Sequence, residues 1–386
     1  MRYSLEKKIR SEALEQFSKA SKTLFNPVLR NWKNRGGKIV GYFCSTVPEE
    51  LITAAGAIPL RMRATGSTNT ERSDAFFSSI NCSFARHCFN QALIGEFKFL
   101  DGVVCVNSCD HVRRIYDNWT RFVPDTPFIE VMSLPRKTES AQVAWYRDEI
   151  NLLRGKLEKH FGVKISNKTL WKAIKLHNET RRLQKKLYEL RKQERPPITG
   201  SETLAVMVAG TAMPKEQYNN MLRELLDELK GAKGQASHRA RLMIVGGILD
   251  DPAYVKVIED QGGLVVTDSL CFGTRIMWVE VDESISDPAE ALAKYYVSDR
   301  PTCPRFYGEH DNRAKYVIDM CREFKCDGVI AERLMFCDLW GVEHYMLGQE
   351  LKAAGIPMLK LDREYITGGV GQLRTRVQAF LETIEK

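Results

Sequence analysis

The sequence predicts an α/β protein with two doubly wound parallel-sheet domains, an N-terminal helix and a helical segment between the domains. Three observations lead to this prediction. A chain of 386 residues is too long for one compact core. Short apolar runs alternate with segments of helical periodicity on both sides of residue 200, which indicates parallel strands covered by helices on both faces of a sheet. Residues 140–194 lie between these regions and are highly charged, with helical spacing.

The elements of the first domain follow in order along the chain. Residues 1–35 are predicted to form a helix, because apolar side chains recur there at roughly helical spacing, and Gly36-Gly37 ends it. The strands expected next are Lys38–Phe43, Ile58–Arg61, Gly102–Val106 and Phe128–Met132. The helices expected between them are Glu49–Ala55, Ser83–Gly95 and His111–Trp119.

The middle segment carries an apolar seam with a basic face opposite it. The seam consists of Leu176, Thr180, Leu183, Leu187 and Leu190. The opposite face consists of Arg181, Arg182, Lys185 and Lys186. Such a seam packs either on its own subunit or against a second subunit, and both alternatives stay open. Arg195-Pro196-Pro197 stops the helix and begins a linker.

Apolar runs resume after the linker and predict a second sheet. The expected strands are Leu204–Ala209, Leu242–Gly246, Leu264–Thr267, Gly328–Ala331 and Met358–Leu361. The predicted division of the chain is 1–140 for the N-terminal helix and first domain, 141–200 for the helical segment and linker, and 201–386 for the second domain.

Charge and composition exclude several classes of partner. The net charge of +8 is spread along the chain, and no RNP motif or zinc finger is present, so nucleic-acid binding is not expected. A phosphate-bearing small molecule or an acidic partner protein suits this charge. No apolar run is long enough for a transmembrane helix, and the start of the chain lacks the apolar core of a signal peptide. A cytoplasmic protein without a membrane partner is therefore predicted.

Ten cysteines in a chain predicted to be cytoplasmic indicate metal or redox chemistry. None forms a CxxC pair, which argues against a zinc ribbon and a thioredoxin-type site. Cys105 lies inside an apolar run, and it is predicted to be a small buried hydrophobic residue, as are Cys321 and Cys326.

The remaining positions point to one shared site. Open parallel sheets bind ligands beyond the carboxyl ends of their strands, and four cysteines follow predicted strands there: Cys44, Cys109, Cys271 and Cys337. Cys82 and Cys303 lie in loops that could reach the same edge. Converging thiolates without a CxxC suit an iron–sulfur cluster better than structural zinc. We therefore predict an iron–sulfur site in the cleft between the two domains.

Several segments resemble one known family. GYFCSTVPEELITAAGAIPLRM at 41–62 resembles the opening signature of the 2-hydroxyacyl-CoA dehydratase and benzoyl-CoA reductase family. The resemblance continues through Asn81-Cys82-Ser83, Asn107-Ser108-Cys109-Asp110 and Phe336-Cys337-Asp338, and it ends with GGVGQLRTRVQAFLE at 368–382. Chain length, the Cys44-Ser45-Thr46 segment and the RTRVQAFLE ending most resemble the smaller catalytic subunit of ATP-dependent benzoyl-CoA reductase.

This resemblance implies a cofactor and a set of partners. Family members pair as paralogous subunits around cysteine-bound four-iron clusters. A separate ATP-hydrolysing iron–sulfur protein feeds them electrons, with ferredoxin as the ultimate donor. The cysteines that match the ligand motifs are Cys82, Cys109 and Cys337. Those that resemble additional ligands of a double-cubane branch are Cys44, Cys271 and Cys303, so a single four-iron cube and a double cubane both remain open.

The resemblance also implies an activity on CoA thioesters. The expected activity is reduction of the aromatic ring of a CoA thioester. The alternatives are a subunit of a radical (R)-2-hydroxyacyl-CoA dehydratase, a double-cubane reductase, and a subunit that only relays electrons. The chain contains neither GxxxxGK[ST] nor a GxGxxG that opens a helix after a strand, so the partner is expected to bind any ATP.

Side chains near the proposed ligand loops are candidates for proton delivery and CoA binding. Asp110, His111 and His344 are the candidates for proton transfer, although His344 could equally be a solvent-facing helix residue. Arg113 and Arg114 are candidates for CoA phosphates or for a solvated helical turn. The Gly368–Gly371 segment is expected to help build the cleft.

Overall fold

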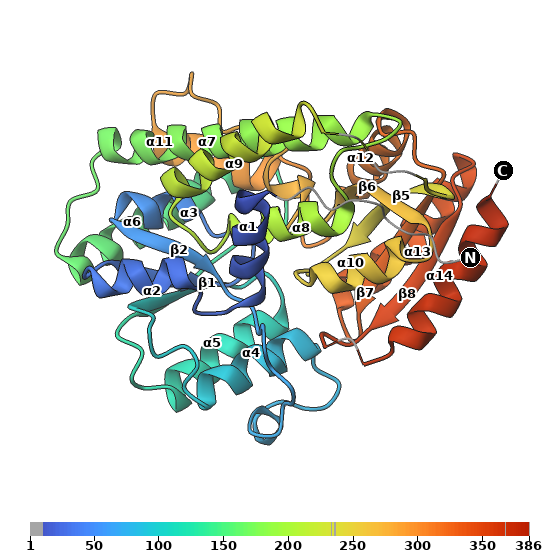
Figure 1. Cartoon of the computed structure of the whole chain (residues 1–386). Helices are drawn as coiled ribbons and strands as arrows, with labels where there is room; N and C mark the ends of the chain where they lie inside the picture. Colours follow the sequence, from blue (N-terminus) through green and yellow to red (C-terminus); the bar gives the residue numbers. More distant parts are fainter. Residues whose placement is uncertain (1–10, 233, 235–236, 367, 386) are drawn as a thin grey trace.

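Two parallel sheets of four strands each organise the chain (Figure 1), as the alternation of apolar runs and helices predicts. The structure is a computed structural model and describes residues 11–232, 234, 237–366 and 368–385. The first sheet contains β1 (Lys38–Tyr42), β2 (Ala57–Arg61), β3 (Gly102–Val106) and β4 (Ile129–Met132). The second contains β5 (Ala240–Gly246), β6 (Gly263–Ser269), β7 (Gly328–Leu334) and β8 (Met358–Arg363).

Both sheets have the same strand order. The first is arranged β2-β1-β3-β4 and the second β6-β5-β7-β8, with every neighbouring pair parallel. In each sheet the second strand along the chain lies on one side of the first strand, and the third and fourth strands lie on its other side. The two sheets therefore repeat one topology, although the sequence shows no residue-level repeat.

Helices cover both faces of the first sheet. Alternate side chains of β3 separate its two cores: Val103 and Cys105 pack on one side, and Val104 and Val106 on the other. The first side is covered by α2 (Pro27–Asn34), α4 (Ser83–Leu93) and α5 (Asp110–Phe122). The other is covered by α3 (Glu49–Ala54), α6 (Ser140–Phe161), α7 (Asn167–Glu189) and α11 (Pro288–Lys294). Cys105 is fully buried in the first of these two cores, which confirms the prediction that it is a small buried hydrophobic residue.

The second sheet is enclosed in the same way. One face packs on α10 (Pro252–Glu259) and α14 (Val370–Ile384), and the other on α12 (His310–Glu323) and α13 (Asp338–Ala353). A further layer contains α1 (Glu12–Lys22), α8 (Gly200–Ala209) and α9 (Lys215–Leu229). Short 3₁₀ turns lie at Ser73–Ala75, Leu190–Lys192 and Thr274–Ile276, and one π-helical turn, η4, at Tyr295–Asp299. No helix among the described residues is both long and apolar enough to cross a membrane.

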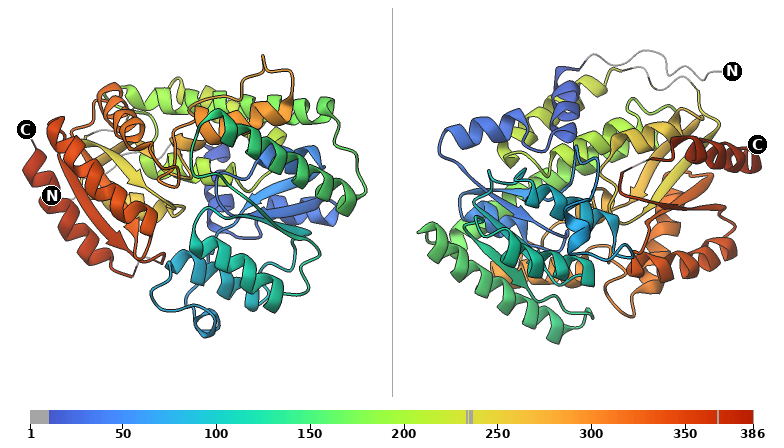
Figure 2. Two further views of the ribbon diagram at one scale, coloured as in Figure 1. Left: turned by 180° about the vertical axis from the view of Figure 1, so that it is seen from behind. Right: turned by 90° about the horizontal axis from the view of Figure 1, so that it is seen from below.

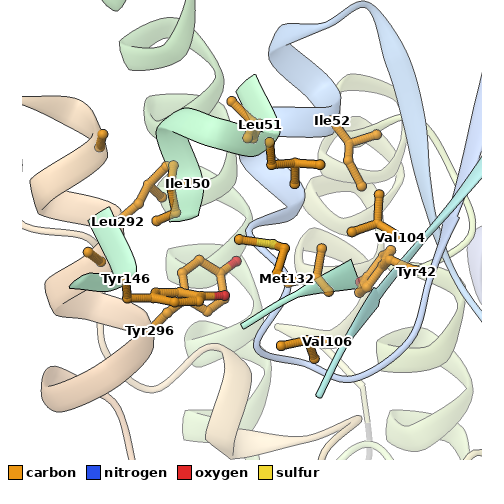
Figure 3. Packing of buried hydrophobic residues seen from close by; sticks show 14 of the residues in the cluster. Tyr42, Leu51, Ile52, Val104, Val106, Met132, Tyr146, Ile150, Leu292 and Tyr296 are labelled. Carbon is orange, nitrogen blue, oxygen red and sulfur yellow. The ribbon is translucent and has the colours of Figure 1, made fainter. Parts of the chain in front are cut away.

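Segments far apart in the sequence pack together and hold the two sheets in place (Figures 1 and 2). Helix α1 lies against α8, and α11 lies against α6. Figure 3 shows Tyr146 and Ile150 of α6 gathered with Leu292 and Tyr296, and all four belong to the same buried cluster as Val104 of the first sheet. These contacts join segments that lie on opposite sides of the predicted domain boundaries at residues 140 and 200.

The predicted strand at Leu204–Ala209 is wrong, because these residues form the C-terminal part of α8. Every one of them is buried, so the helix is apolar all round and shows no periodicity that separates it from a buried strand. A capping box marks its start: the Thr199 side chain accepts the Glu202 N–H, and the Glu202 side chain accepts the Thr199 N–H.

The predicted N-terminal helix is two helices over its described part. Residues 1–10 lie outside the described residues. Helix α1 ends at Lys22, and α2 begins at Pro27, whose fixed φ suits a first helical position. The Asn26 side chain caps α2 by accepting the Leu29 N–H at 3.0 Å, and it also donates to the Ala212 carbonyl at 2.9 Å. The break in the helix therefore anchors the N-terminal segment to the second half of the chain.

The seam of the middle segment packs within the chain. Leu183 and Leu187 are buried against α1, α8 and α9, so the first of the two alternatives is confirmed for them. The basic face is not uniform: Arg182 is exposed, whereas Arg181 is buried and pairs with the Glu50 carboxylate. Arg181 therefore does not share the exposed face of Arg182, because α3 covers that side of α7.

Candidate functional site

Six of the ten cysteines line a single cavity of about 900 Å³ between the two sheets. They are Cys44, Cys82, Cys109, Cys271, Cys303 and Cys337. All six are free thiols. These are the residues that the sequence assigned to a shared site, and the structure brings all of them together.

The repeated topology explains why they converge. In a doubly wound sheet the ligand crevice opens where two neighbouring strands send the chain to opposite sides. In the first sheet those strands are β1 and β3, which are followed by Cys44 and Cys109. In the second sheet β7 is followed by Cys337, and β6 by Cys271. The carboxyl ends of both sheets thus face one cavity.

Three of the cysteines stand at helix N-termini. Cys82, Cys109 and Cys337 are the N-cap residues of α4, α5 and α13. Backbone N–H groups of the first helical turns point at each sulfur and favour its ionised form. The positive ends of three helices therefore surround the place where an anionic group would sit.

Two of the cysteine loops have unusual backbone conformations. The described residues include three non-glycine positions with positive φ, and two of them are at this cavity: Cys44 at φ 75° and Phe336, beside Cys337, at φ 63°. Residues other than glycine rarely adopt this region, and such strain is concentrated at functional sites. The Thr46 hydroxyl donates to the Cys44 sulfur at 3.3 Å and helps to hold it in place.

The thiols influence one another across the cavity. Burial, reinforced by the neighbouring cysteines, raises the pKa of Cys109 to about 12. Burial also raises the pKa of Cys303 to about 11, and it raises the pKa values of Cys82 and Cys337. Buried thiolates that face one cavity repel, so they cannot all ionise together unless positive charge is placed among them.

Cys271 is the exception, because arginine side chains surround it. Burial opposes its ionisation, but Arg275 and Arg61 outweigh burial and lower the pKa of Cys271. The Arg275 Nη2 atom lies 2.9 Å from the Cys271 sulfur. Arg61 donates to the Cys271 carbonyl and stacks 4.1 Å from the Phe272 ring centroid. Both cations are buried, so they compensate negative charge that is itself shielded from solvent.

The type of donor on this cavity suits an iron–sulfur cluster, whose protein ligands are cysteine thiolates. Across the described parts of the chain, no three His, Cys, Asp or Glu side chains meet closely enough to hold a single ion. The six cysteine side chains on this cavity are nevertheless all free thiols, the donor type that holds iron–sulfur clusters. The residues present therefore fit an iron–sulfur group.

The predicted proton donors lie in different environments. The His111 Nε2 atom is 2.9 Å from the Phe336 carbonyl, and its Nδ1 is 3.1 Å from the Asn81 side chain. His111 thus joins the loop before Cys82 to the loop before Cys337. Asp110 lines the cavity, but its carboxylate is 78% exposed and pairs with Arg113 at 3.6 Å.

His344 lies away from the cavity lining. It is buried on α13, its ring centroid is 5.6 Å from that of Trp340, and burial lowers its pKa to about 4. It is therefore a neutral side chain inside the protein, not the solvent-facing histidine that was the alternative. Among the other candidates, Arg113 lines the cavity, whereas Arg114 and the Gly368–Gly371 segment do not.

The mouth of the cavity contains residues that sequence reasoning missed. Arg136, Lys137 and Arg305 supply positive charge there, and Trp145 and Tyr307 supply aromatic rings that are 47% and 77% exposed. The Tyr307 N–H donates to the Arg136 carbonyl at 2.6 Å, so the two loops are tied together. No periodicity or motif distinguishes these residues in the sequence; the only indication was the surplus of positive charge.

Comparison with known proteins identifies the family. The family model described as 2-hydroxyglutaryl-CoA dehydratase, D-component, matches residues 44–384. The beta subunit of (R)-2-hydroxyglutaryl-CoA dehydratase from Acidaminococcus fermentans is 26% identical over 377 residues, which are 97% of this chain and 99% of that protein. YjiM of Escherichia coli, provisionally named a dehydratase subunit, is 30% identical over 381 residues, 96% of this chain and 97% of that one.

A protein named for reductase activity is similarly related. One benzoyl-CoA reductase subunit, from Thauera aromatica, is 26% identical over 363 residues, which are 92% of this chain and 94% of that protein. Since the family model and these relatives span nearly the whole chain, the resemblance seen in the cysteine motifs is confirmed, and the protein belongs to the 2-hydroxyglutaryl-CoA dehydratase D-component family.

Proposed function

We propose that this chain is the catalytic iron–sulfur subunit of an ATP-dependent benzoyl-CoA reductase. In this role it reduces the aromatic ring of a CoA thioester with low-potential electrons from an ATPase partner. The observation that carries the proposal is the convergence of six free cysteines on one cavity large enough for a substrate. A volume of about 900 Å³ lies within the range of ligand sites, and the lining is mostly apolar, which suits an aromatic acyl group.

Three cysteines are proposed to hold a four-iron cluster: Cys82, Cys109 and Cys337. Cys44, Cys271 and Cys303 are then available for a second, fused cube. The bound cluster would supply single electrons at low potential, with an iron left open by the protein. The helix N-termini at Cys82, Cys109 and Cys337, together with Arg275, stabilise the negative charge of such a group.

Side chains at the mouth are proposed to bind the CoA moiety. Arg136, Lys137 and Arg305 match the charge of its phosphates, and Trp145 and Tyr307 offer ring faces for the adenine. Reduction of the ring also requires protons. We propose Asp110 and His111 as their source, and His111 has to release the Phe336 carbonyl or Asn81 before it transfers a proton.

Partners are part of the proposal, because the chain contains no phosphate-binding loop of its own. We propose a paralogous second subunit and ATP-hydrolysing iron–sulfur subunits that draw electrons from ferredoxin. The relatives support a multi-subunit assembly, since their names designate subunits. The chain is proposed to act in the cytoplasm.

Metal analysis followed by reconstitution tests this function. Anaerobically purified protein should contain at least about four irons per chain and no stoichiometric zinc. ATP-dependent reduction of benzoyl-CoA should appear only when the paralogous subunit and the ATPase pair are added. Colourless protein with one zinc per chain would overturn the cluster, and turnover by the isolated chain with ATP would overturn the partner requirement.

A dehydratase subunit is the second candidate, favoured by the names of the matching family model and the dehydratase relatives. The same reconstituted protein should then remove water from an (R)-2-hydroxyacyl-CoA and leave benzoyl-CoA unchanged. A third outcome, cluster reduction without conversion of either thioester, would indicate an electron-relay subunit. Parallel assays with both thioesters separate these functions.

A further inference from the structure

Two cysteines outside the cavity lie in direct contact with each other. Cys321 is in the last turn of α12, and Cys326 is two residues before β7 begins at Gly328. The Cys321 thiol is the largest cause of a raised pKa at Cys326. The pair lies near the amino end of β7, whereas the six-cysteine cavity opens at the carboxyl end, and neither thiol lines that cavity.

The way α12 ends produces this contact. The helix stops at Glu323, and Lys325 takes the left-handed conformation at φ 52°. The Lys325 N–H then donates to the Arg322 carbonyl at 3.2 Å, and the Cys326 N–H to the Cys321 carbonyl at 2.8 Å. These two bonds define a Schellman motif, which places the third-from-last residue of a helix against the second residue beyond its cap. Those two positions usually carry hydrophobic side chains in contact, and here both are cysteine.

We propose that Cys321 and Cys326 are a reversible dithiol–disulfide pair that exchanges with low-molecular-weight disulfides. A disulfide needs Cα atoms separated by about 4.4–6.8 Å and side chains that point toward each other. The direct backbone hydrogen bond holds the two residues close, and the effect of Cys321 on the pKa of Cys326 agrees with neighbouring thiols. The backbone hydrogen bond therefore keeps the two residues within reach of each other.

The exchange proceeds in two balanced steps. Cys326 is half-buried whereas Cys321 is buried, so Cys326 reacts first. Its thiol loses a proton and attacks the small disulfide, forming a mixed disulfide and releasing one thiolate. Cys321 then loses its proton, attacks the Cys326 sulfur and releases the second thiolate. The protein loses two electrons and two protons, and the small disulfide is reduced to two thiols.

Neighbouring groups set the pace of this exchange. The contact with Cys321, together with burial, raises the pKa of Cys326, while the Arg241 guanidinium opposes this effect. The Met243 sulfur lies 3.5 Å from the Cys321 sulfur and closes the inner side of the pair. The dithiol is therefore the resting form, and exchange is expected over hours of incubation.

Peptide mapping tests the pair without any measurement of activity. Anaerobically purified protein is incubated with oxidised glutathione, free thiols are blocked with an alkylating agent, and the unreduced protein is digested with trypsin. Trypsin cuts after Arg322 and Lys325, inside the loop that the disulfide closes. A disulfide should therefore join the peptides 316–322 and 326–333, and reduction should separate them. Protein kept without glutathione should give the two peptides alkylated and unlinked.

Single variants test the order of the steps. In Cys321→Ser, Cys326 should stop at the mixed disulfide with glutathione. In Cys326→Ser, Cys321 should remain unmodified. Cys105→Ser, whose thiol is buried alone in the first sheet, should leave the linked peptides unchanged. The proposal is overturned if the folded wild-type protein yields no linked peptides, or if they appear only after denaturation.

Discussion

Replacing Arg181 by methionine should destabilise the protein strongly, whereas the same change at Arg182 should have little effect. Arg181 is buried and pairs with Glu50, which is completely buried. Its guanidinium also donates to Tyr295 at 3.1 Å and lies 4.3 Å from that ring centroid. Arg182 pairs with Glu280, but both of these side chains are more than 40% exposed.

The expected magnitude follows from the charge that is left behind. Methionine fills a similar volume but leaves the Glu50 carboxylate buried, and among the described residues only the Tyr296 hydroxyl then donates to it, at 2.7 Å. Breaking a buried pair in this way costs about 3–5 kcal/mol, whereas an exposed pair contributes less than about 1 kcal/mol. The entropy of unfolding for 386 residues is about 0.8 kcal/mol/K, so the thermal midpoint should fall by about 4–6 °C in Arg181→Met and by about 1 °C or less in Arg182→Met.

The pH dependence provides an independent check. Burial disfavours the Glu50 charge, but Arg181 and His177 together outweigh burial and lower the pKa of Glu50. In the wild type the stability contributed by the Glu50 charge is therefore present above the pKa that Glu50 has in the unfolded chain. This stability is lost as the pH falls through the pKa that Glu50 has in the folded protein. In Arg181→Met the main positive partner of Glu50 is gone while burial remains, so Glu50 takes up a proton more readily and the stability deficit should shrink as the pH falls from 7.

Calorimetry or circular dichroism melts of the two variants at pH 7 and at about pH 5 measure this effect. The double variant Glu50→Gln/Arg181→Met should recover part of the loss, because it removes the unpaired charge. The reasoning is refuted if Arg181→Met and Arg182→Met melt at the same temperature, or if the deficit of Arg181→Met does not change with pH.

Three further predictions concern the cluster, a titrating carboxyl and a buried histidine. Serine in place of any one proposed cluster ligand (Cys82, Cys109 or Cys337) should abolish iron retention. Cys105→Ala should keep the iron and should cost about 1 kcal/mol in stability. Equal iron loss in all four variants would contradict the assignment. Burial raises the pKa of Glu259 to about 7 from an ordinary value of 4.5, so the stability of the protein should fall as the pH rises between these values. Thermal melts of Glu259→Gln should show a weaker dependence of stability on pH over this range. His344→Phe should retain turnover, because the His344 ring is neutral and its Nε2 atom has no hydrogen-bond partner within the described part of the chain. Loss of turnover with intact iron would restore His344 as a proton donor.

The repeated topology connects the fold with the proposed chemistry. Each sheet alone supplies only part of the cysteine set: Cys44, Cys82 and Cys109 come from the first, and Cys271, Cys303 and Cys337 from the second half. The site therefore exists only when both sheets are folded and held together. Helices α1 and α11, which pack across the division of the chain, contribute to this arrangement.

Some predictions failed because local patterns are ambiguous when a segment is buried on all sides. Residues 204–209 are uniformly apolar, and a wholly buried helix and a wholly buried strand share that pattern. Arg181 and Arg182 are adjacent and chemically identical, so only the position of α3 decides which of them is buried. The prediction of Cys326 as a simple hydrophobic residue misses its contact with Cys321, because that contact depends on the left-handed Lys325.

The sequence by itself determined the fold class, the strands of both sheets and the set of six cysteines. It did so because strand ends and helix starts are local features, and because the carboxyl ends of parallel strands meet at one edge. Only the tertiary structure decided that Arg61 and Arg275 accompany Cys271 and that His344 lies inside the protein. These facts depend on contacts between residues far apart in the chain, and no short-range pattern in the sequence specifies such contacts.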